Sequence, residues 1–154
     1  MGVTMAGLVA VDIRSDDRGI SRLLERMGFG EFIQEDDKVQ PILAQIGEYL
    51  AGQRRDFDFP IHWSVMTPFQ QQSLQATYAI PYGQTVTYGE IARRIGRPRS
   101  ARAVGRAQAT NPMPLVIPCH RVLGADGGLH GYGAGEGLAT KAWLLKLEAG
   151  TFAK

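Results

Sequence analysis

The chain has 154 residues, of which 44% are hydrophobic and 21% charged, values typical of a globular protein and not of a disordered one. No apolar run reaches the ~20 residues of a membrane span, and the N-terminus reaches Asp12 without the basic flank of a secretory signal. The single cysteine cannot form an internal disulfide and, with three scattered histidines, gives no zinc-ligand spacing. We therefore expect a cytoplasmic protein with no metal and no cofactor.

Charge is distributed unevenly along the chain. Residues 1–60 carry seven Lys/Arg against eleven Asp/Glu, a net −4, whereas residues 61–154 carry ten against four, a net +6. A basic cluster is usually a solvated face, but a cluster made only of arginine on predicted helices favours a phosphate-bearing partner such as nucleic acid. The cluster consists of Arg93, Arg94, Arg97, Arg99, Arg102 and Arg106.

The first sixty residues read as a small scaffold. Residues 7–13 place Val9, Val11 and Ile13 on one face, which predicts a strand, and residues 39–52 carry apolar residues at helical spacing. Residues 19–28 are compatible with either a strand or a short helix, and residues 54–63 predict an extended linker. This part contains no catalytic constellation, and its acidic balance argues against contact with DNA.

Two helices are predicted by their start signals. Thr67 and Thr87 are each followed three residues later by Gln or Glu, the pattern of a capping box. The first box predicts a helix to about Ile80, and the second predicts a helix that stops at Gly96.

A third helix, over residues 101–110 and capped by Ser100, follows a four-residue turn, which makes the pair a helix-turn-helix. Arg102 and Arg106 share one face of this helix. The remaining positions are nearly all Ala or Gly, which fits either tight packing against a neighbour or close approach to a minor groove ~6 Å wide. In the second case Arg102 could reach inside the duplex.

The rest of the chain alternates breaks and short elements. Residues 111–114 contain two prolines that end the preceding helix, and residues 115–118 are expected to run extended into the cysteine. Residues 131–137 form a glycine loop, and residues 138–150 predict a closing helix.

Cys119, the only cysteine, directly precedes His120. Neighbouring side chains diverge in a strand and in a helix, so a direct dyad requires a backbone turn and an indirect one requires a bridging water. A thiol needs a base to attack near neutral pH, and that base needs a carboxylate on its far nitrogen, for which Glu136 and Glu148 are the candidates. An inert buried thiol is the alternative.

The string "NPMPLVIPCHRV", with "ARAVG" before it and "KAWLLKLEAG" after it, resembles the O6-alkylguanine-DNA alkyltransferases (methylated-DNA–protein-cysteine methyltransferases), closely from Pro68 onward. The resemblance implies an α+β fold. A small N-terminal mixed α/β domain with a short sheet, a helix and a linker would span residues 1–62. A mainly helical C-terminal domain of winged-helix type, with the helix-turn-helix, would span residues 63–154.

The resemblance also implies the catalytic roles. Cys119 is similar to the nucleophile that takes and keeps the alkyl group, and His120 to the base that acts through a water. Glu148 matches the carboxylate that orients the histidine, and Asn111 matches the residue that fixes the turn before the active site. Tyr88 matches the tyrosine that gives a proton to the leaving guanine.

The partner implied is double-stranded DNA containing O6-alkylguanine, bound through the minor groove, with no membrane and no obligatory protein partner. Arg102 matches the arginine that fills the gap while the damaged nucleotide flips out. The other DNA-binding residues are Arg99, Ala101, Ala103, Gly105 and Arg106. The substrate pocket comprises Pro114, Val122, Tyr132 and Gly133. The loop after Tyr132 is two residues longer than is usual in the family, and Gly133 replaces a frequent serine.

The implied reaction is irreversible and single-turnover, on O6 of guanine and also on O4 of thymine. A non-catalytic alkyltransferase-like lesion sensor is the main alternative, but such proteins lack the thiol that Cys119 provides. A sequence-specific regulator would need more side chains than residues 101–109 offer for reading base edges. A cysteine hydrolase would turn over repeatedly.

Overall fold

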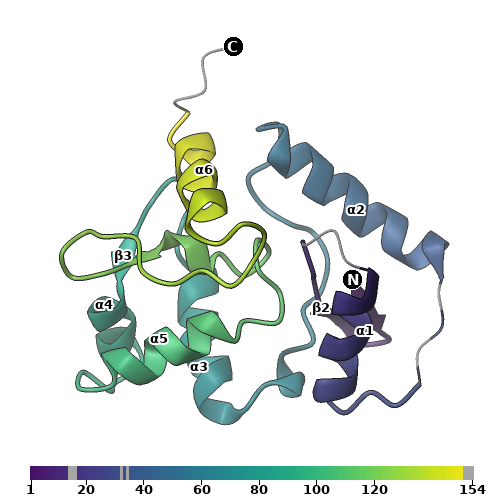
Figure 1. Ribbon diagram of the computed structural model, residues 1–154, viewed down its shortest axis with the longest axis horizontal. Coiled ribbons are helices and arrows are strands. Elements are labelled where there is room, and N and C mark those ends of the chain that lie inside the picture. The colour runs from purple at the N-terminus through teal and green to yellow at the C-terminus, as the bar shows by residue number, and fades with distance from the viewer. Residues whose placement is uncertain (14–16, 32, 34, 151–154) are drawn as a thin grey trace.

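The computed structural model describes residues 1–13, 17–31, 33 and 35–150. Its elements form two groups that lie side by side (Figure 1). The first group contains β1 (Gly2–Thr4), β2 (Gly7–Ala10), α1 (Asp17–Arg26) and α2 (Asp36–Leu50). The second contains the 3₁₀ turn η1 (Trp63–Val65), α3 (Pro68–Tyr78), β3 (Val86–Thr87), α4 (Tyr88–Arg94), α5 (Ala101–Ala109), the 3₁₀ turn η2 (Cys119–Arg121), β4 (Val122–Leu123) and α6 (Leu138–Glu148). This combination of short strands and helices confirms the predicted α+β fold.

A small antiparallel hairpin begins the chain. β1 pairs with β2, with Val3 opposite Leu8. The backbone of Leu8 also pairs with the predicted linker, since its N–H donates to the Pro60 carbonyl at 2.9 Å and its carbonyl accepts from His62 N–H at 2.9 Å. Gly7 has φ +127° at this crossing, and a Cβ there would collide with the Pro60 carbonyl. The linker is therefore extended because it lies along the hairpin. The stretch that was compatible with a strand or a helix is the helix α1.

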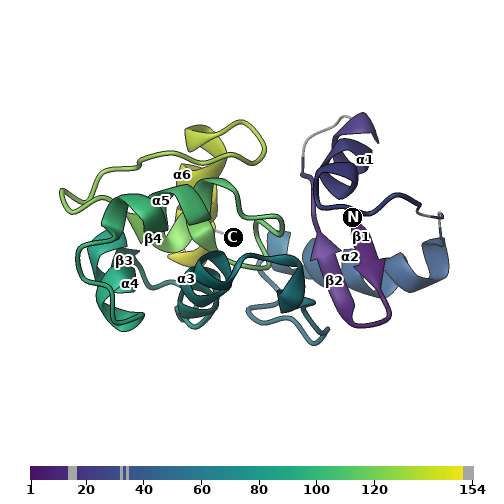
Figure 2. The same ribbon diagram turned by 90° about the horizontal axis from the view of Figure 1, so that it is seen from below.

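The helix-turn-helix is confirmed as α4 and α5, which pack against each other and against α3 (Figure 2). Thr87 forms a complete capping box: its side chain accepts from Glu90 N–H at 3.2 Å, and its own N–H donates to Glu90 at 2.6 Å. Gly96, with φ +71°, ends α4 as predicted. These helices enclose a second apolar cluster made of Ile80, Val86, Ile91, Ala92, Val104 and Val122.

Three local predictions need correction. Thr67 caps α3 by accepting from Gln70 N–H, but the Gln70 side chain bonds Thr110 instead of returning to the cap. Ser100 occupies the N-cap position of α5 but makes no capping bond, because its hydroxyl donates to the Arg97 carbonyl at 2.7 Å. Residues 115–118 form a tight turn and not an extended segment.

The turn has a clear cause. Asn111 donates from Nδ2 to the Ile117 carbonyl at 2.9 Å and accepts from Met113 N–H at 3.0 Å. Ile117 N–H in turn bonds the Met113 carbonyl at 2.9 Å, and Leu115 takes φ +77°. The Asn111 side chain thus provides hydrogen bonds to backbone groups that, next to two prolines, have no regular helix or strand partners.

The main hydrophobic core contains residues from both groups of elements. Tyr49 of α2 is fully buried there, beside Leu74 of α3 and Leu144 of α6. Because one apolar cluster joins both groups, the boundary between residues 62 and 63 stays a prediction. Across the described residues, no helix combines the length and apolar character needed to cross a bilayer.

Replacing Thr87 by alanine should destabilise the fold. The change removes a complete capping box, so the free energy of unfolding should fall by about 1 kcal/mol and the Tm by about 2–4 °C. Thermal unfolding followed by circular dichroism measures the effect. Ser100→Ala is the matched control, because Ser100 makes no capping bond, and it should shift the Tm by less than half as much. Equal shifts would contradict the assignment of the cap.

Candidate functional site

Cys119, His120 and Glu148 lie together in the interior. The turn η2 carries the first two, and the C-terminal end of α6 carries the third. His120 is fully buried, and its Nε2 lies 2.7 Å from Glu148 Oε1. The other ring nitrogen, Nδ1, is buried and has no hydrogen-bond partner among the described residues. If Nε2 carries the proton toward the carboxylate, Nδ1 is the atom with a free lone pair, and it can accept a proton.

Glu148 is held by several donors at once. Arg121 donates from Nε to both carboxylate oxygens, at 2.9 and 3.1 Å, and from Nη2 at 2.9 Å. Gly83 N–H donates at 3.0 Å, and the Tyr49 hydroxyl donates to Oε1. Burial alone would raise the pKa of Glu148, but the hydrogen bonds from His120 and Arg121 outweigh it and hold the pKa at about 2. The carboxylate is therefore ionised at neutral pH. The other sequence candidate, Glu136, lies on the exposed loop before α6.

The thiol and the imidazole are both neutral in this resting arrangement. Burial raises the pKa of the Cys119 thiol, although a hydrogen bond from Asn111 and the charge of Lys141 lower it in part. Burial lowers the pKa of His120, and the hydrogen bond to Glu148 raises it in part. The thiol therefore needs proton transfer to a base before it can attack an electrophile.

A second polar group surrounds Lys141 of α6, a fully buried lysine. Its Nζ donates to the Val122 carbonyl at 2.7 Å and to the His130 carbonyl at 3.2 Å. The Tyr88 hydroxyl donates to the same His130 carbonyl at 2.9 Å. Sequence reasoning did not select Lys141, because a lysine on a helix is nearly always solvated. No sequence signal distinguishes it from an exposed one.

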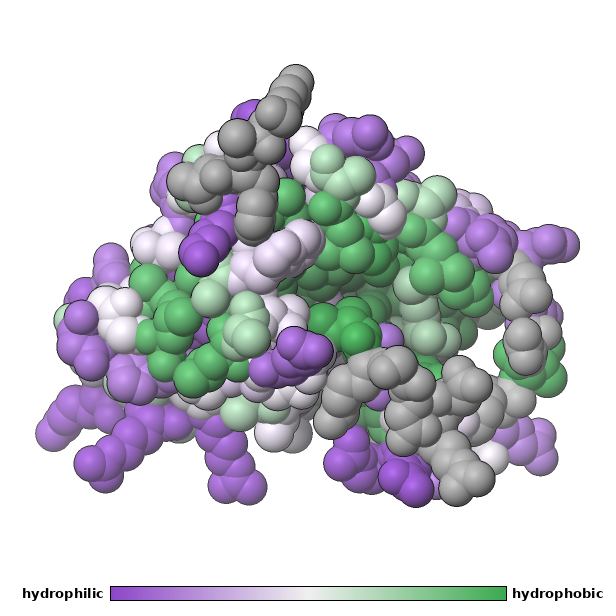
Figure 3. Space-filling model, turned by 45° about the horizontal axis from the view of Figure 1, so that its top comes forward, coloured by the Kyte–Doolittle hydropathy of each residue, from purple (hydrophilic) through white to green (hydrophobic). Residues whose placement is uncertain are grey.

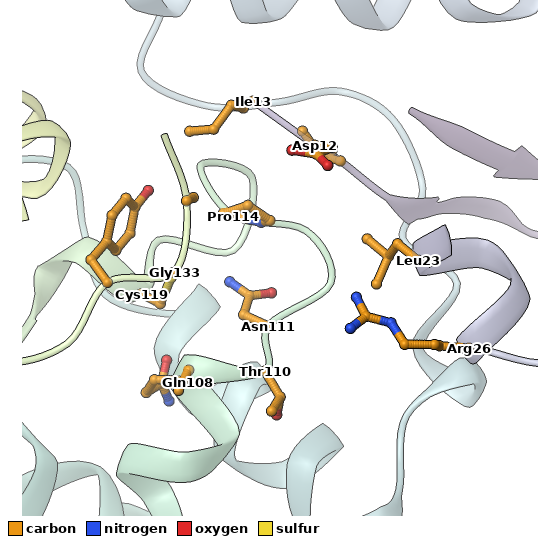
Figure 4. A pocket seen from close by; sticks show the side chains of 14 residues that line it. Asp12, Ile13, Leu23, Arg26, Gln108, Thr110, Asn111, Pro114, Cys119 and Gly133 are labelled. Atoms are coloured by element: carbon orange, nitrogen blue, oxygen red, sulfur yellow. The ribbon is translucent and has the colours of Figure 1, made fainter. Parts of the chain in front are cut away.

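Cys119 opens onto a cavity of about 420 Å³ (Figure 4). Pro114, Tyr132 and Gly133 line it, as predicted for the substrate pocket, whereas Val122 is not among its lining residues. The Tyr132 hydroxyl is buried without a partner among the described residues. The opposite wall comes from the first group of elements: Val11, Asp12, Ile13, Leu23 and Arg26.

The first sixty residues, in which the sequence shows no catalytic constellation, thus form part of the cavity wall. Figure 4 shows Arg26 of α1 and Asn111 directed toward the same space. The sequence does not indicate this arrangement, because the two residues meet only when the two groups of elements pack together.

The arginines of the helix-turn-helix lie on the surface, where hydrophilic side chains extend from the lower left of Figure 3. Arg99, Arg102 and Arg106 are all exposed. The small residues of α5 divide between two faces: Ala103 is exposed, Ala101 and Gly105 are half-buried, and Ala107 belongs to the interior. One side of this helix packs tightly, and the other presents a low surface with arginines, for which close approach to a minor groove stays a prediction.

Residues 68–150 match the family model described as the DNA-binding domain of 6-O-methylguanine DNA methyltransferase. Over 149 residues the chain is 40% identical to an inducible methylated-DNA–protein-cysteine methyltransferase of Bacillus subtilis, an alignment covering 94% of this chain and 80% of that protein.

Solved structures agree with this match. The chain superposes with a TM-score of 0.65 and 45% identity on Mycobacterium tuberculosis OGT in complex with DNA, covering 71% of this chain and 66% of that one. For the O6-methylguanine-DNA methyltransferase of Pyrococcus kodakaraensis the TM-score is 0.59 at 29% identity, covering 85% and 75%.

Glu148→Gln should reduce stability in a pH-dependent way. The carboxylate has a folded pKa of about 2 against an ordinary 4.5, so its contribution is complete above pH 4.5 and is lost as the pH falls toward 2. At pH 7 the variant should lose about 3 kcal/mol, because Arg121 stays buried without its partner, and the difference from the original chain should narrow at pH 3. Thermal unfolding at both pH values tests this. Glu136→Gln removes the same charge from the exposed loop and should change little. A Glu148→Gln deficit that is equal at both pH values would contradict the assignment.

Proposed function

This chain belongs to the 6-O-methylguanine DNA methyltransferase family, and from that premise we propose that it repairs DNA as a methylated-DNA–protein-cysteine methyltransferase. It takes an alkyl group from O6 of guanine onto its own Cys119. The observation that carries this proposal is a buried thiol at a cavity, next to His120. The Nδ1 of this histidine has no hydrogen-bond partner among the described residues, and its Nε2 is bonded to an ionised carboxylate.

The reaction begins when the proton of Cys119 passes to His120 Nδ1 through a water. Sγ then attacks the alkyl carbon on O6, so that an S–C bond forms while the C–O6 bond breaks and its electron pair stays on guanine. The Tyr88 hydroxyl leaves the His130 carbonyl, gives a proton to N3 of the leaving base and regains one from solvent. His120 releases its proton to solvent. One proton thus leaves the thiol and one arrives on guanine.

The lesion reaches Cys119 only after its nucleotide has left the duplex, since the alkylated atom lies within the base stack. We assign Arg102 to the gap that the flipped nucleotide leaves in the minor groove, and Arg99 and Arg106 to phosphates. Ala101, Ala103 and Gly105 let the helix approach closely. The structure of the Mycobacterium tuberculosis relative is described as a complex with DNA, which supports a duplex as the partner.

The flipped base lies in the cavity against Pro114, Tyr132 and Gly133. We assign the exocyclic amine to the second lone pair of the Val122 carbonyl, since Lys141 uses the first. Because Val122 does not line the cavity, this contact requires the pocket to open further around the base. O4-alkylthymine presents a similar alkyl ether and is a second substrate.

A non-catalytic lesion sensor is the other candidate, and the thiol at the cavity favours the transferase. We also propose that the protein acts in the cytoplasm.

Transfer should be stoichiometric. The chain has one cysteine and no second thiol to accept the group, and a thioether does not release it, so each molecule should act once. Intact-mass measurement after incubation with excess O6-methylguanine DNA should show one added methyl group per chain, on Cys119. Cys119→Ser should bind the same DNA, measured by fluorescence anisotropy, and acquire no methyl group. Methylated protein from that variant, or several guanines repaired per chain, would refute the proposal.

Arg102→Ala should separate base flipping from chemistry. Its repair of duplex DNA should slow by at least about tenfold, since extrusion costs a few kcal/mol, whereas its reaction with free O6-benzylguanine should change less than about threefold. Arg106→Ala is the control on the same exposed helix face. Arg106→Ala should weaken binding to all DNA sequences. The salt dependence of the affinity should fall by the amount that corresponds to about one phosphate contact. Equal slowing of both substrates by Arg102→Ala would exclude the role in flipping.

A further inference from the structure

Tyr49 of α2 reaches the catalytic group from the N-terminal elements. It is fully buried, and its hydroxyl donates to Glu148 Oε1, the oxygen that also bonds His120. The same hydroxyl lies 3.4 Å from His120 Nε2. A residue 71 positions before the histidine and 99 before the glutamate in sequence thus contacts both.

The phenol ring is fixed by aromatic neighbours. Tyr82 packs edge-on against it with ring centroids 5.9 Å apart and an interplanar angle of 83°, and Phe57 lies at 5.4 Å. Phenylalanine would fill the same space. A buried hydroxyl adds a desolvation cost unless it is hydrogen-bonded, so the hydroxyl matters for what it bonds, and that is the carboxylate.

Several charged or titratable groups act on the His120–Glu148 pair. Arg121 lies against Glu148, and the charge of Lys141 acts on His120. Tyr132 places its ring edge-on to His120 at 6.5 Å. Tyr82, which carries Arg55 and Arg121 over its ring, also senses the charge of Glu148. Cys119 directly precedes His120, and in the proposed reaction it gives its proton to Nδ1, the ring nitrogen that does not bond Glu148.

Tyr49 bonds Oε1, the oxygen that His120 and Arg121 also bond, and it does so as a neutral donor that comes from α2. Its O–H dipole directs positive charge at Oε1 and so weakens the attraction of that oxygen for a protonated His120. Without the hydroxyl, the carboxylate would hold an imidazolium more strongly, and His120 would be protonated at higher pH.

We propose that Tyr49 is a positioning residue for the alkyl transfer, by which α2 fixes Glu148 and keeps His120 in its neutral, proton-accepting form. This inference rests on the proposed function for its role in the reaction. Through Tyr49, α2 thus contributes a side chain to the proton relay and does not only pack against the elements that carry it.

The test compares Tyr49→Phe with Tyr82→Phe. Both remove one hydroxyl from the same aromatic cluster, but the hydroxyl of Tyr82 forms no hydrogen bond with the described residues. The ring resonances of His120, followed by NMR across pH in the free protein, should titrate about one pH unit higher in Tyr49→Phe than in the original chain. In Tyr82→Phe the titration of His120 should move by less than about a third of that shift.

The reaction with O6-benzylguanine gives a second readout. In Tyr49→Phe the acid limb of the rate–pH profile should move to higher pH by the same amount. The rate on the alkaline plateau should stay within about threefold of that of the original chain. An unchanged titration, or equal shifts in both variants, would overturn the proposal. If Tyr49→Phe does not fold, 3-fluorotyrosine at position 49, a stronger donor, should shift the titration downward, and an upward shift or none would refute the assignment.

The two proposals can fail separately. A chain that acquires no alkyl group from DNA or from O6-benzylguanine would refute the proposed function. The NMR titration needs no substrate, and in that case it would still decide whether Tyr49 controls the protonation of His120.

Discussion

The buried carboxylate of Glu148 is the group on which the rest of the site depends. Within the described residues, its donors come from α2, the loop after α3 and the turn η2, which are far apart in sequence. A buried carboxylate is stable only when its acceptors are satisfied, so all of these segments must be in place together. The same carboxylate fixes the ring of His120, which directly follows the thiol. Folding of the core and assembly of the site are therefore one event.

Burial keeps the thiol and the imidazole of this site unreactive in the resting state. The pKa of Cys119 is raised and that of His120 is lowered, so the neutral thiol and imidazole dominate at neutral pH. If the protein uses its one thiol once, as proposed, a free thiolate would be lost to any electrophile in solution. A relay that ionises the sulfur only as a substrate arrives in the cavity avoids that loss. The low reactivity of the resting thiol is thus compatible with the proposed function and useful to it.

Local signals in the sequence predicted what depends on neighbours along the chain. The capping box at Thr87 and the stop at Gly96 placed α4 correctly, because both act within one turn of helix. Contacts between distant segments could not be predicted in this way. Tyr49 reads as one more apolar position on α2, and Lys141 reads as a solvated lysine, until packing brings Glu148 and the Val122 carbonyl to them. The turn before Cys119 likewise depends on the Asn111 side chain, which propensities do not include.

Under the proposed function, the geometry of α5 sets the distance that a flipped nucleotide must cover. Arg102 stands in its first turn, while Ala109 and Thr110 at its other end line the cavity. Seven residues of helix span about 10 Å, or roughly three base-pair steps. If Arg102 has its proposed role, a base displaced there has to rotate out along the helix to reach the cavity. The charge distribution orients the approach, since the basic part attracts the duplex and the net −4 of residues 1–60 repels it. These charges favour the proposed approach of DNA to α5, with the wall from α1 on the far side of the cavity.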